Sequence, residues 1–380
     1  MNKSFLNKSF MKYFNTSFIK LPTPININLW WTFGSMLGIM LMIQIITGLF
    51  LSMHYCPNIN LAFNSIIHII QETKNGNLMR FIHLNGASMY FICMYIHISR
   101  NMYFQSYKLI STWMIGIIIL FMSMATAFLG YILPWGQMSF WGATVITNLL
   151  SSIPYLGNYL VQWLWGGFSI NNATLNRFFS FHFILPFIIF MMMLIHLMSL
   201  HFYGSSNPLG INSNLNKIPF HNYFTFKDLI GLMMLMISIL MLILINPNLL
   251  NDPDNFSIAN PMITPIHIQP EWYFLFAYSI LRSIPNKLGG VISLIMSIMI
   301  LFTLPLTHKN KINSISFYPM NKLYYWMFIN TFILLTWTGM KPIEYPFYLL
   351  SQMLTFNYFM YFILNPIMMN LWDLIINQKK

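Results

Sequence analysis

Charged residues are scarce in this chain. Only 7% of its 380 residues are Asp, Glu, Lys or Arg, whereas soluble domains carry roughly 25%. Hydrophobic residues make up 57%, and long stretches such as residues 109–176 and 178–216 carry no charge at all. A membrane-spanning helix needs about 20 largely apolar residues, so several stretches can hold one or more. The composition excludes a soluble globular protein and indicates a polytopic membrane protein.

Cysteine is nearly absent as well, with only Cys56 and Cys93 in the chain. No CxxC or CxxCH motif occurs, which argues against a disulfide framework and against covalent haem attachment. The apolar runs are continuous rather than alternating with period two, so helices are expected instead of a β-barrel. The sequence therefore predicts an all-α fold.

Eight transmembrane helices are expected. They cover residues 30–52, 78–101, 112–133, 178–200, 228–246, 289–307, 322–340 and 349–372. An even number places both termini on one side, where thirteen Lys and Arg residues face two acids; the other side has six cations and five acids. The positive-inside rule makes the amino-terminal side the inner one. The basic first twenty residues are interpreted as an inner surface segment, with a transit peptide as the alternative.

Two long loops fall on the outer side. Residues 134–176 are aromatic and almost uncharged, and "LPWGQMSFWGATVITNLL" within them predicts a short amphipathic helix on the outer surface. Residues 246–287 are rich in proline. Loops of this length in a compact protein are usually functional.

Histidines occur in two pairs with the same spacing. His83 and His97 bound "HLNGASMYFICMYIH", and His182 and His196 bound "HFILPFIIFMMMLIH". Fourteen residues rise by about 21 Å in nearly four turns, so each pair shares one helix face at two depths. The threading puts His83 level with His182 and His97 level with His196. Two facing imidazoles per level match the axial ligands of haem iron, whereas structural zinc needs four protein ligands.

Glycines and arginines accompany these histidines. Glycines fourteen residues apart occur in the first span, Gly34 and Gly48, and in the third, Gly116 and Gly130. They let a helix approach a flat macrocycle closely, although ordinary small-residue helix packing is the alternative. Arg80 and Arg100 each lie three residues beyond a histidine, where a cation can pair with a haem propionate.

These motifs, together with "PEWYFLFAYSILRSIPNKLGG", resemble the cytochrome b family of the respiratory ubiquinol–cytochrome c reductase. The resemblance runs from about Leu21 onward and departs at Phe202, where an acid is frequent. It implies that residues 1-225 form a four-helix bundle around two stacked, non-covalent b-type haems, of low potential outside and high potential inside. Residues 226-380 would add four helices and an outer quinol-site loop.

The resemblance also implies function and partners. It implies a redox enzyme subunit that oxidises ubiquinol outside, passes electrons through both haems, reduces quinone inside and contributes to proton translocation. The implied partners are a Rieske-type iron–sulfur protein, cytochrome c1, other complex III subunits and membrane lipids, in a dimeric complex without nucleic acid. The implied location is the mitochondrial inner membrane, with both termini on the matrix side.

Site residues carry over from the family by position. His83 and His182 would ligate the low-potential haem, and His97 and His196 the high-potential one. The outer quinol site would use Phe128, Tyr131, Gly142, Val145, Ile146, Pro270, Glu271, Phe274 and Tyr278. The inner quinone site would use Ser35, His201, Ser205, Phe220, Lys227 and Asp228.

The expected catalytic residues are Glu271, Tyr131, His201 and Asp228, and at the inner site His201, Lys227 and Asp228 can hydrogen-bond or deliver protons. Glu271 is the only acid in the apolar part of the outer loops, so it is the expected proton acceptor, with a loop-anchoring carboxylate as the alternative. Two other functions compete with the redox subunit. A proton channel would use the histidines as a relay, but a relay needs closer steps than fourteen residues. A transmembrane reductase with another donor is disfavoured by the outer "PEWY" loop.

Overall fold

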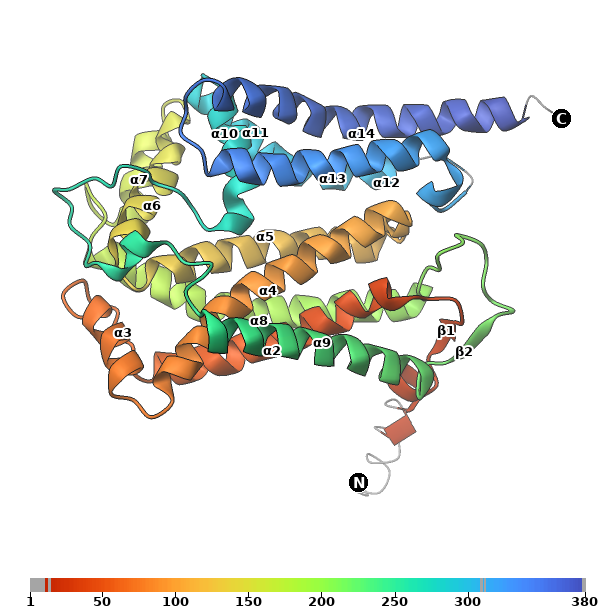
Figure 1. Cartoon of the computed structure of the whole chain (residues 1–380), viewed down its shortest axis with the longest axis horizontal. Helices are drawn as coiled ribbons and strands as arrows, with labels where there is room; N and C mark the ends of the chain where they lie inside the picture. The colour runs from red at the N-terminus through yellow and green to blue at the C-terminus, as the bar shows by residue number, and fades with distance from the viewer. Residues whose placement is uncertain (1–10, 13–14, 308–309, 311, 378–380) are drawn as a thin grey trace.

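The computed structural model of the chain describes residues 11–12, 15–307, 310 and 312–377. Long helices run alongside one another through the molecule (Figure 1). Within the described residues, seven helical stretches are long and apolar enough to cross a membrane. They are Leu29–Ser52 (η2 and α2), Gly76–Tyr103 (α4), Ile110–Ile132 (α5), Asn172–Tyr203 (α8), Tyr223–Ile245 (α9), Lys287–Thr307 (α11, η7 and α12) and Phe347–Ile376 (within α14). The expected all-α, polytopic membrane fold is confirmed.

The eighth expected span is the helix α13, Pro319–Gly339, whose 21 residues are also long enough to cross. It differs from the other seven because polar residues such as Asn321 and Lys322 lower its mean hydropathy. Asn321 is buried against α14, where its Nδ2 donates to the backbone oxygen and to Oδ1 of Asn365, both at 2.8 Å. The polarity of α13 therefore serves contact with its neighbour.

The spanning helices form two groups. In the first, α2 packs on α4 and α5 packs on α8; in the second, α13 packs on α14 and on the short helix α10, Leu275–Ser283. The largest buried cluster lies where these groups meet, with Phe91 and Met94 of α4 among its residues. The segment Asn15–Ile19 and the end of α14 lie at the same end of the molecule (Figure 1). This placement agrees with an even number of crossings.

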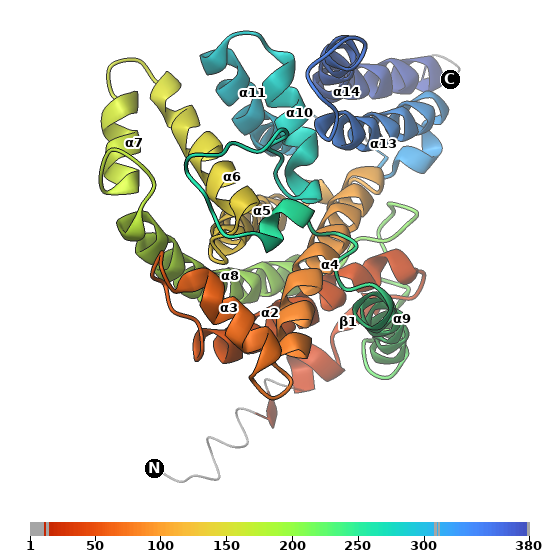
Figure 2. The same ribbon diagram turned by 60° about the vertical axis from the view of Figure 1, so that its left-hand side comes forward.

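Short helices cover the opposite end. They are α3 (Ala62–Gln71), α6 (Gln137–Thr147) and α7 (Gly157–Trp165). The expected surface helix is α6, whereas α3 and α7 were not expected from the sequence. The segment between α9 and α10 crosses this end close to α6 (Figure 2), held where Gln137 N donates to Ser257 O at 3.0 Å. This crossing segment carries Glu271.

Two short strands form an exception to the helical fold. β1 (Pro22–Pro24) pairs antiparallel with β2 (Lys217–Pro219), with Thr23 opposite Ile218. The pair ties the chain before α2 to the chain before α9. It thereby fixes the inner ends of these two helices relative to each other.

The helix α8 begins six residues before the expected span. Asn171 caps it, since its Oδ1 accepts from Ala173 N at 2.9 Å and its own N donates to Thr174 Oγ1 at 3.2 Å. Such a capping box satisfies helix N–H groups that otherwise lack partners. The cap therefore carries the helix past the end of the apolar run.

The close packing of α13 on α10 gives a stability prediction. A Cβ at Gly339 would lie 2.5 Å from the backbone oxygen of Leu275, which cannot turn away. Gly339→Ala should therefore destabilise the detergent-solubilised protein by about 1–3 kcal/mol, measured as a lower thermal unfolding midpoint. Gly38→Ala is the control, because nothing lies within 4 Å of its Cβ position. Equal midpoints for both variants would contradict the packing.

Candidate functional site

Four histidines face one another between α4 and α8. The ring centres of His83 and His182 are 6.2 Å apart, and those of His97 and His196 are 6.4 Å apart. The two pairs are separated by fourteen residues, about 21 Å, along each helix. The two levels predicted from the spacing are therefore present.

The outer pair is held in a defined tautomer. His182 Nδ1 lies 2.8 Å from the backbone oxygen of Thr126, which can only accept, so Nδ1 carries the proton. His83 Nδ1 lies 2.9 Å from Thr47 Oγ1, which itself donates to Ile43 O at 2.7 Å. In both rings the Nε2 lone pair is left available. Hydrogen bonds of this kind orient histidines that ligate metals.

Each of the four glycines spaced by fourteen residues lies against one of the histidine rings. A Cβ at Gly130 would be 2.4 Å from His182 Cε1, and one at Gly48 would be 3.1 Å from His83 Cε1. The inner level follows the same pattern, with 3.2 Å from Gly116 to His196 Cε1 and 3.5 Å from Gly34 to His97 Cε1. The glycines thus make room for the imidazoles of the neighbouring helix, a closer role than approach to a macrocycle alone.

The geometry at both levels fits a metal held by two imidazoles. A metal–nitrogen distance of about 2 Å on each side, plus about 1 Å to each ring centre, gives roughly 6 Å. Across the part of the chain that the structure describes, no cluster of three or more His, Cys, Asp or Glu side chains could hold a metal ion. Two imidazoles leave the other coordination positions to a bound group, and a haem would supply those ligands.

Buried hydrogen-bond donors near the inner histidine level also suit a haem. The guanidinium of Arg100 lies 4.9 Å above the Trp31 ring. Arg100 Nε and Trp31 Nε1 are both buried without an acceptor among the described residues. Buried N–H groups normally have partners, so these two suit an anionic group such as a haem propionate.

Arg80 and Arg100 mark the two edges of the bundle. They lie twenty residues apart on α4, which is about 30 Å and matches the hydrocarbon thickness of a bilayer. Arg80 is close enough to Glu271 for their charges to interact. The outer arginine therefore faces the outer pocket as well as the level of His83.

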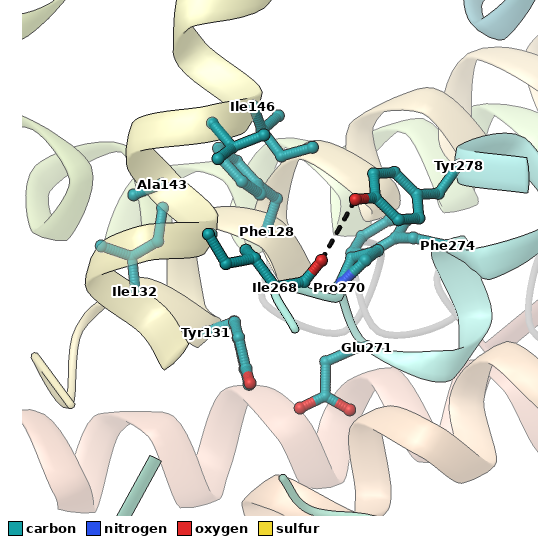
Figure 3. A pocket seen from close by; sticks show the side chains of 12 residues that line it. Phe128, Tyr131, Ile132, Ala143, Ile146, Ile268, Pro270, Glu271, Phe274 and Tyr278 are labelled. Carbon is teal, nitrogen blue, oxygen red and sulfur yellow. Dashed lines mark hydrogen bonds between the residues drawn. The ribbon is translucent and has the colours of Figure 1, made fainter. Parts of the chain in front are cut away.

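All nine residues expected at the outer quinol site line one pocket (Figure 3). They are Phe128, Tyr131, Gly142, Val145, Ile146, Pro270, Glu271, Phe274 and Tyr278. The structure adds Ile132, Ala143 and Ile268. The pocket lies between α5, α6 and the segment leading into α10, and its lining is almost entirely apolar.

Glu271 is the only acid among the lining residues. It directly precedes the 3-10 turn η6, Trp272–Phe274. Burial, with Asp252 adding like charge and Arg80 opposing both, raises the pKa of Glu271 to about 7. Its carboxylate points to the same side of the pocket as the Tyr131 hydroxyl, while Tyr278 donates to Ile268 O at 3.1 Å (Figure 3). The arrangement can accept a proton near neutral pH.

The inner residues are brought together less completely. Asp228 lies beside Ser35, whose hydroxyl donates to Thr32 O at 2.8 Å. Lys227 donates to Ile27 O at 2.8 Å, so its ammonium is held by the chain before α2.

The other three residues reach this end from separate segments. Phe220 N donates to Leu21 O at 3.0 Å, and its ring lies 6.0 Å from that of Phe224. His201 is in the last turn of α8, and Ser205 follows that helix. All six residues thus lie at the inner end, where Asp228 lies beside Ser35.

Three residues that the sequence did not single out support the histidines and Arg100. They are Thr47, Thr126 and Trp31. Thr47 and Thr126 lie one residue and four residues before the outer-level glycines, Gly48 and Gly130. The short distance in sequence from these glycines could have pointed to both threonines. Thr126, however, acts through its backbone oxygen, which any residue supplies. The role of Thr126 in orienting His182 can therefore be recognised only in the three-dimensional structure.

Comparisons with known proteins match nearly the whole chain. A family model described as cytochrome b/b6/petB covers residues 18–204, and one described as the C-terminal cytochrome b/b6/petD covers residues 258–359. The predicted boundary between residues 225 and 226 falls between these matches and stays a prediction.

Individual relatives extend the similarity. A cytochrome b of Apis mellifera ligustica is 60% identical over 374 residues, which cover 96% of this chain and 97% of that protein. A chain of a solved structure described as "Hyperthermophilic respiratory Complex III" has a TM-score of 0.91 and 30% identity, covering 97% of this chain and 98% of that one. The chain therefore belongs to the cytochrome b family, the membrane subunits that transfer electrons between quinol and quinone in respiratory complex III.

Proposed function

We propose that the chain binds two non-covalent b-type haems, one at each histidine level, and carries a quinol-oxidising site outside and a quinone-reducing site inside. The paired imidazoles at two depths are the observation that carries this proposal. His83 and His182 would hold the low-potential haem, and His97 and His196 the high-potential one. The substrates would be ubiquinol and ubiquinone. A reduced-minus-oxidised optical spectrum tests it: two b-type α-bands support it, and none would overturn it.

The haems, when bound, supply reversible one-electron carriers at the two depths. The chain's own residues determine where they sit. The Nε2 atoms of the four histidines would hold the two irons, the four glycines leave space beside the rings, and Arg80 and Arg100 would offer positive charge at the two edges. Trp31 adds a buried donor next to Arg100.

At the outer pocket, the residues have to bind an apolar quinol and remove protons from it. The aromatic and aliphatic lining favours the ring of the quinol, and Pro270 and Phe274 shape the wall beside Glu271. The Glu271 carboxylate is ionised above a pH of about 7 and then accepts a proton from the bound hydroxyl. Asp252 and Arg80 flank Glu271 electrostatically and set how readily it holds that proton. The Tyr131 hydroxyl, on the same side, is placed to share hydrogen bonds with the substrate.

At the inner end, the residues have to supply protons to a reduced quinone. Asp228, beside Ser35, lies near the start of α9 and so close to the inner aqueous phase. His201 and Ser205 approach from α8, with Phe220 offering a ring surface. Lys227, held by Ile27 O, keeps positive charge near the site rather than reaching freely into it.

The membrane location and the partners of the protein form part of the same proposal. A chain of a solved respiratory complex III is similar to this one, and the cation excess at the end that carries Asn15–Ile19 and the end of α14 favours an inner position for that end. We therefore assign the chain to the mitochondrial inner membrane, with both termini on the matrix side. Within complex III its partners would be a Rieske-type iron–sulfur protein, cytochrome c1, further subunits and lipids, in a dimeric assembly.

Changes at one histidine level should leave the other level intact. His196→Leu removes an inner ligand and should abolish the inner haem while the outer one persists. Gly130→Ala should disturb the outer haem instead, because its Cβ would meet the His182 ring at 2.4 Å. Separate α-bands in low-temperature spectra measure both, with Gly38→Ala as the control. Loss of the wrong band in either variant would disprove the assignment by depth.

Replacing Glu271 tests the outer site. Glu271→Gln should keep both haems but lower the rate of quinol oxidation by about 10²–10⁴-fold, the usual contribution of a general base. Because a base with a pKa raised to about 7 loses its charge as the pH falls, the parent rate should decline below that pH. The variant should lack this decline. Glu72→Gln is the control, because Glu72 is an exposed outer residue whose carboxylate pairs with His68. A parent-like rate and pH profile in Glu271→Gln would make Glu271 a loop anchor.

Replacing Asp228 tests the inner site. Asp228→Asn, and separately His201→Ala, should slow reoxidation of the inner haem by quinone, because both residues lie at the inner end. Stopped-flow kinetics with the outer site blocked isolates this step. Asp373→Asn is the matched control, since it makes the same change at the same end of the molecule and keeps an acceptor for Tyr318. If neither site variant slows reoxidation, these residues do not belong to the inner site.

A further inference from the structure

The helix α4 contacts the segment after Glu271 at three consecutive points. Trp272 Nε1 donates to Ser88 Oγ at 3.2 Å. The Phe91 and Tyr273 rings stack with centres 4.3 Å apart and planes 8° from parallel. The Tyr95 hydroxyl donates to Tyr273 O at 2.5 Å. The turn η6 is therefore fixed to α4 by two hydrogen bonds and one ring stack.

These contacts occupy a separate stripe of α4. Ser88, Phe91 and Tyr95 are spaced by three and four residues, which places them on one helix face. With 3.6 residues per turn, that face points away from the one carrying His83 and His97. One helix thus presents histidines to the bundle and a docking face to the outer segment.

Tyr95 is the innermost of the three contacts on α4, and its ring packs against two further helices. Its ring lies 6.0 Å from Phe276 of α10 and 5.2 Å from Phe332 of α13. Among the described residues, the hydroxyl of this packed ring bonds Tyr273 O. Glu271 comes directly before this turn, and its own backbone oxygen accepts from Phe274 N at 2.9 Å. Tyr95 therefore fixes the turn Trp272–Phe274, which begins directly after Glu271.

We propose that Tyr95 is a positioning residue for quinol oxidation: its hydroxyl holds the turn Trp272–Phe274 so that the Glu271 carboxylate stays in the outer pocket. The proposal rests on the proposed role of Glu271. Tyr95 does not line the pocket, so it acts through the backbone of Tyr273 and not on the substrate.

Four charged or titratable groups face Glu271, and a shift of the turn would change how they affect its protonation. They are Arg80 from α4, Asp252 from the segment after α9, Tyr131 from α5 and Tyr273 from the turn itself. Tyr95→Phe keeps the ring and leaves Tyr273 O without its donor. A loosened turn lets water reach the carboxyl, which favours its charged form. The acid side of the pH–rate profile should then move to lower pH.

The experiment compares Tyr95→Phe with Tyr90→Phe in the whole complex. Tyr90 is on the same helix and is buried, but its hydroxyl bonds Ser123 Oγ at 3.0 Å instead of the outer segment. Tyr95→Phe should lower kcat for quinol oxidation by about tenfold, the effect of one neutral hydrogen bond. Its pH midpoint should fall by at least about half a unit. Tyr90→Phe should change neither, and both variants should keep both haem bands.

Two further measurements separate the possible outcomes. Infrared titration of the carboxyl band that Glu271→Gln removes should report the same downward shift in Tyr95→Phe, independently of turnover. In the Glu271→Gln background, adding Tyr95→Phe should cause no further change in the pH profile. If Glu271→Gln itself has no effect, the proposed role of Glu271 fails. If Glu271→Gln matters while Tyr95→Phe matches Tyr90→Phe, or lowers the rate equally at every pH, the positioning role is disproved.

Discussion

Four imidazoles buried between apolar helices are the constraint on which the molecule depends. A polar group moved out of water without a partner costs several kcal/mol, so each ring needs a defined partner for its nitrogens. At the outer level, Thr47 and the backbone of Thr126 take up one nitrogen of each ring. The two ring centres at this level lie 6.2 Å apart, a separation that suits one metal atom between them. The helix α2 packs on both α4 and α8, and α5 packs on α8, so these contacts hold the two histidine-bearing helices at a fixed separation.

The helix α4 links this core to the outer pocket. It carries two of the four histidines, an arginine near each membrane edge and the face on which the turn after Glu271 rests. The pocket residues come from α5, α6 and the segment before α10, which are far apart in the sequence. Their convergence depends on packing against a common support. The outer pocket and the two histidine levels are therefore held in place by the same helix.

The sequence predicted the features that repeat or that depend on composition. Scarcity of charge located all eight long helices to within a few residues at most ends, and the spacing of His83, His97, His182 and His196 gave the two levels. The nine outer pocket residues came from family resemblance, and they do line one pocket. Individual hydrogen bonds could not be predicted from the sequence. The cap at Asn171 makes α8 longer than its apolar run, and the pairing of Thr23 with Ile218 has no periodic pattern in the sequence. The hydrogen bond from the Lys227 ammonium to the backbone oxygen of Ile27 likewise left no signal in the sequence.

The short strand pair also has a consequence for how the protein is made. β1 joins β2 nearly two hundred residues later, and Lys227 reaches back to Ile27. A ribosome releases the amino-terminal part first, so all four histidines have emerged with α8, before either Lys227 or Glu271 exists. The chain order thus allows cofactor loading before the quinone chemistry can start. The inner end closes with α9, and the outer pocket closes last, when α10 arrives.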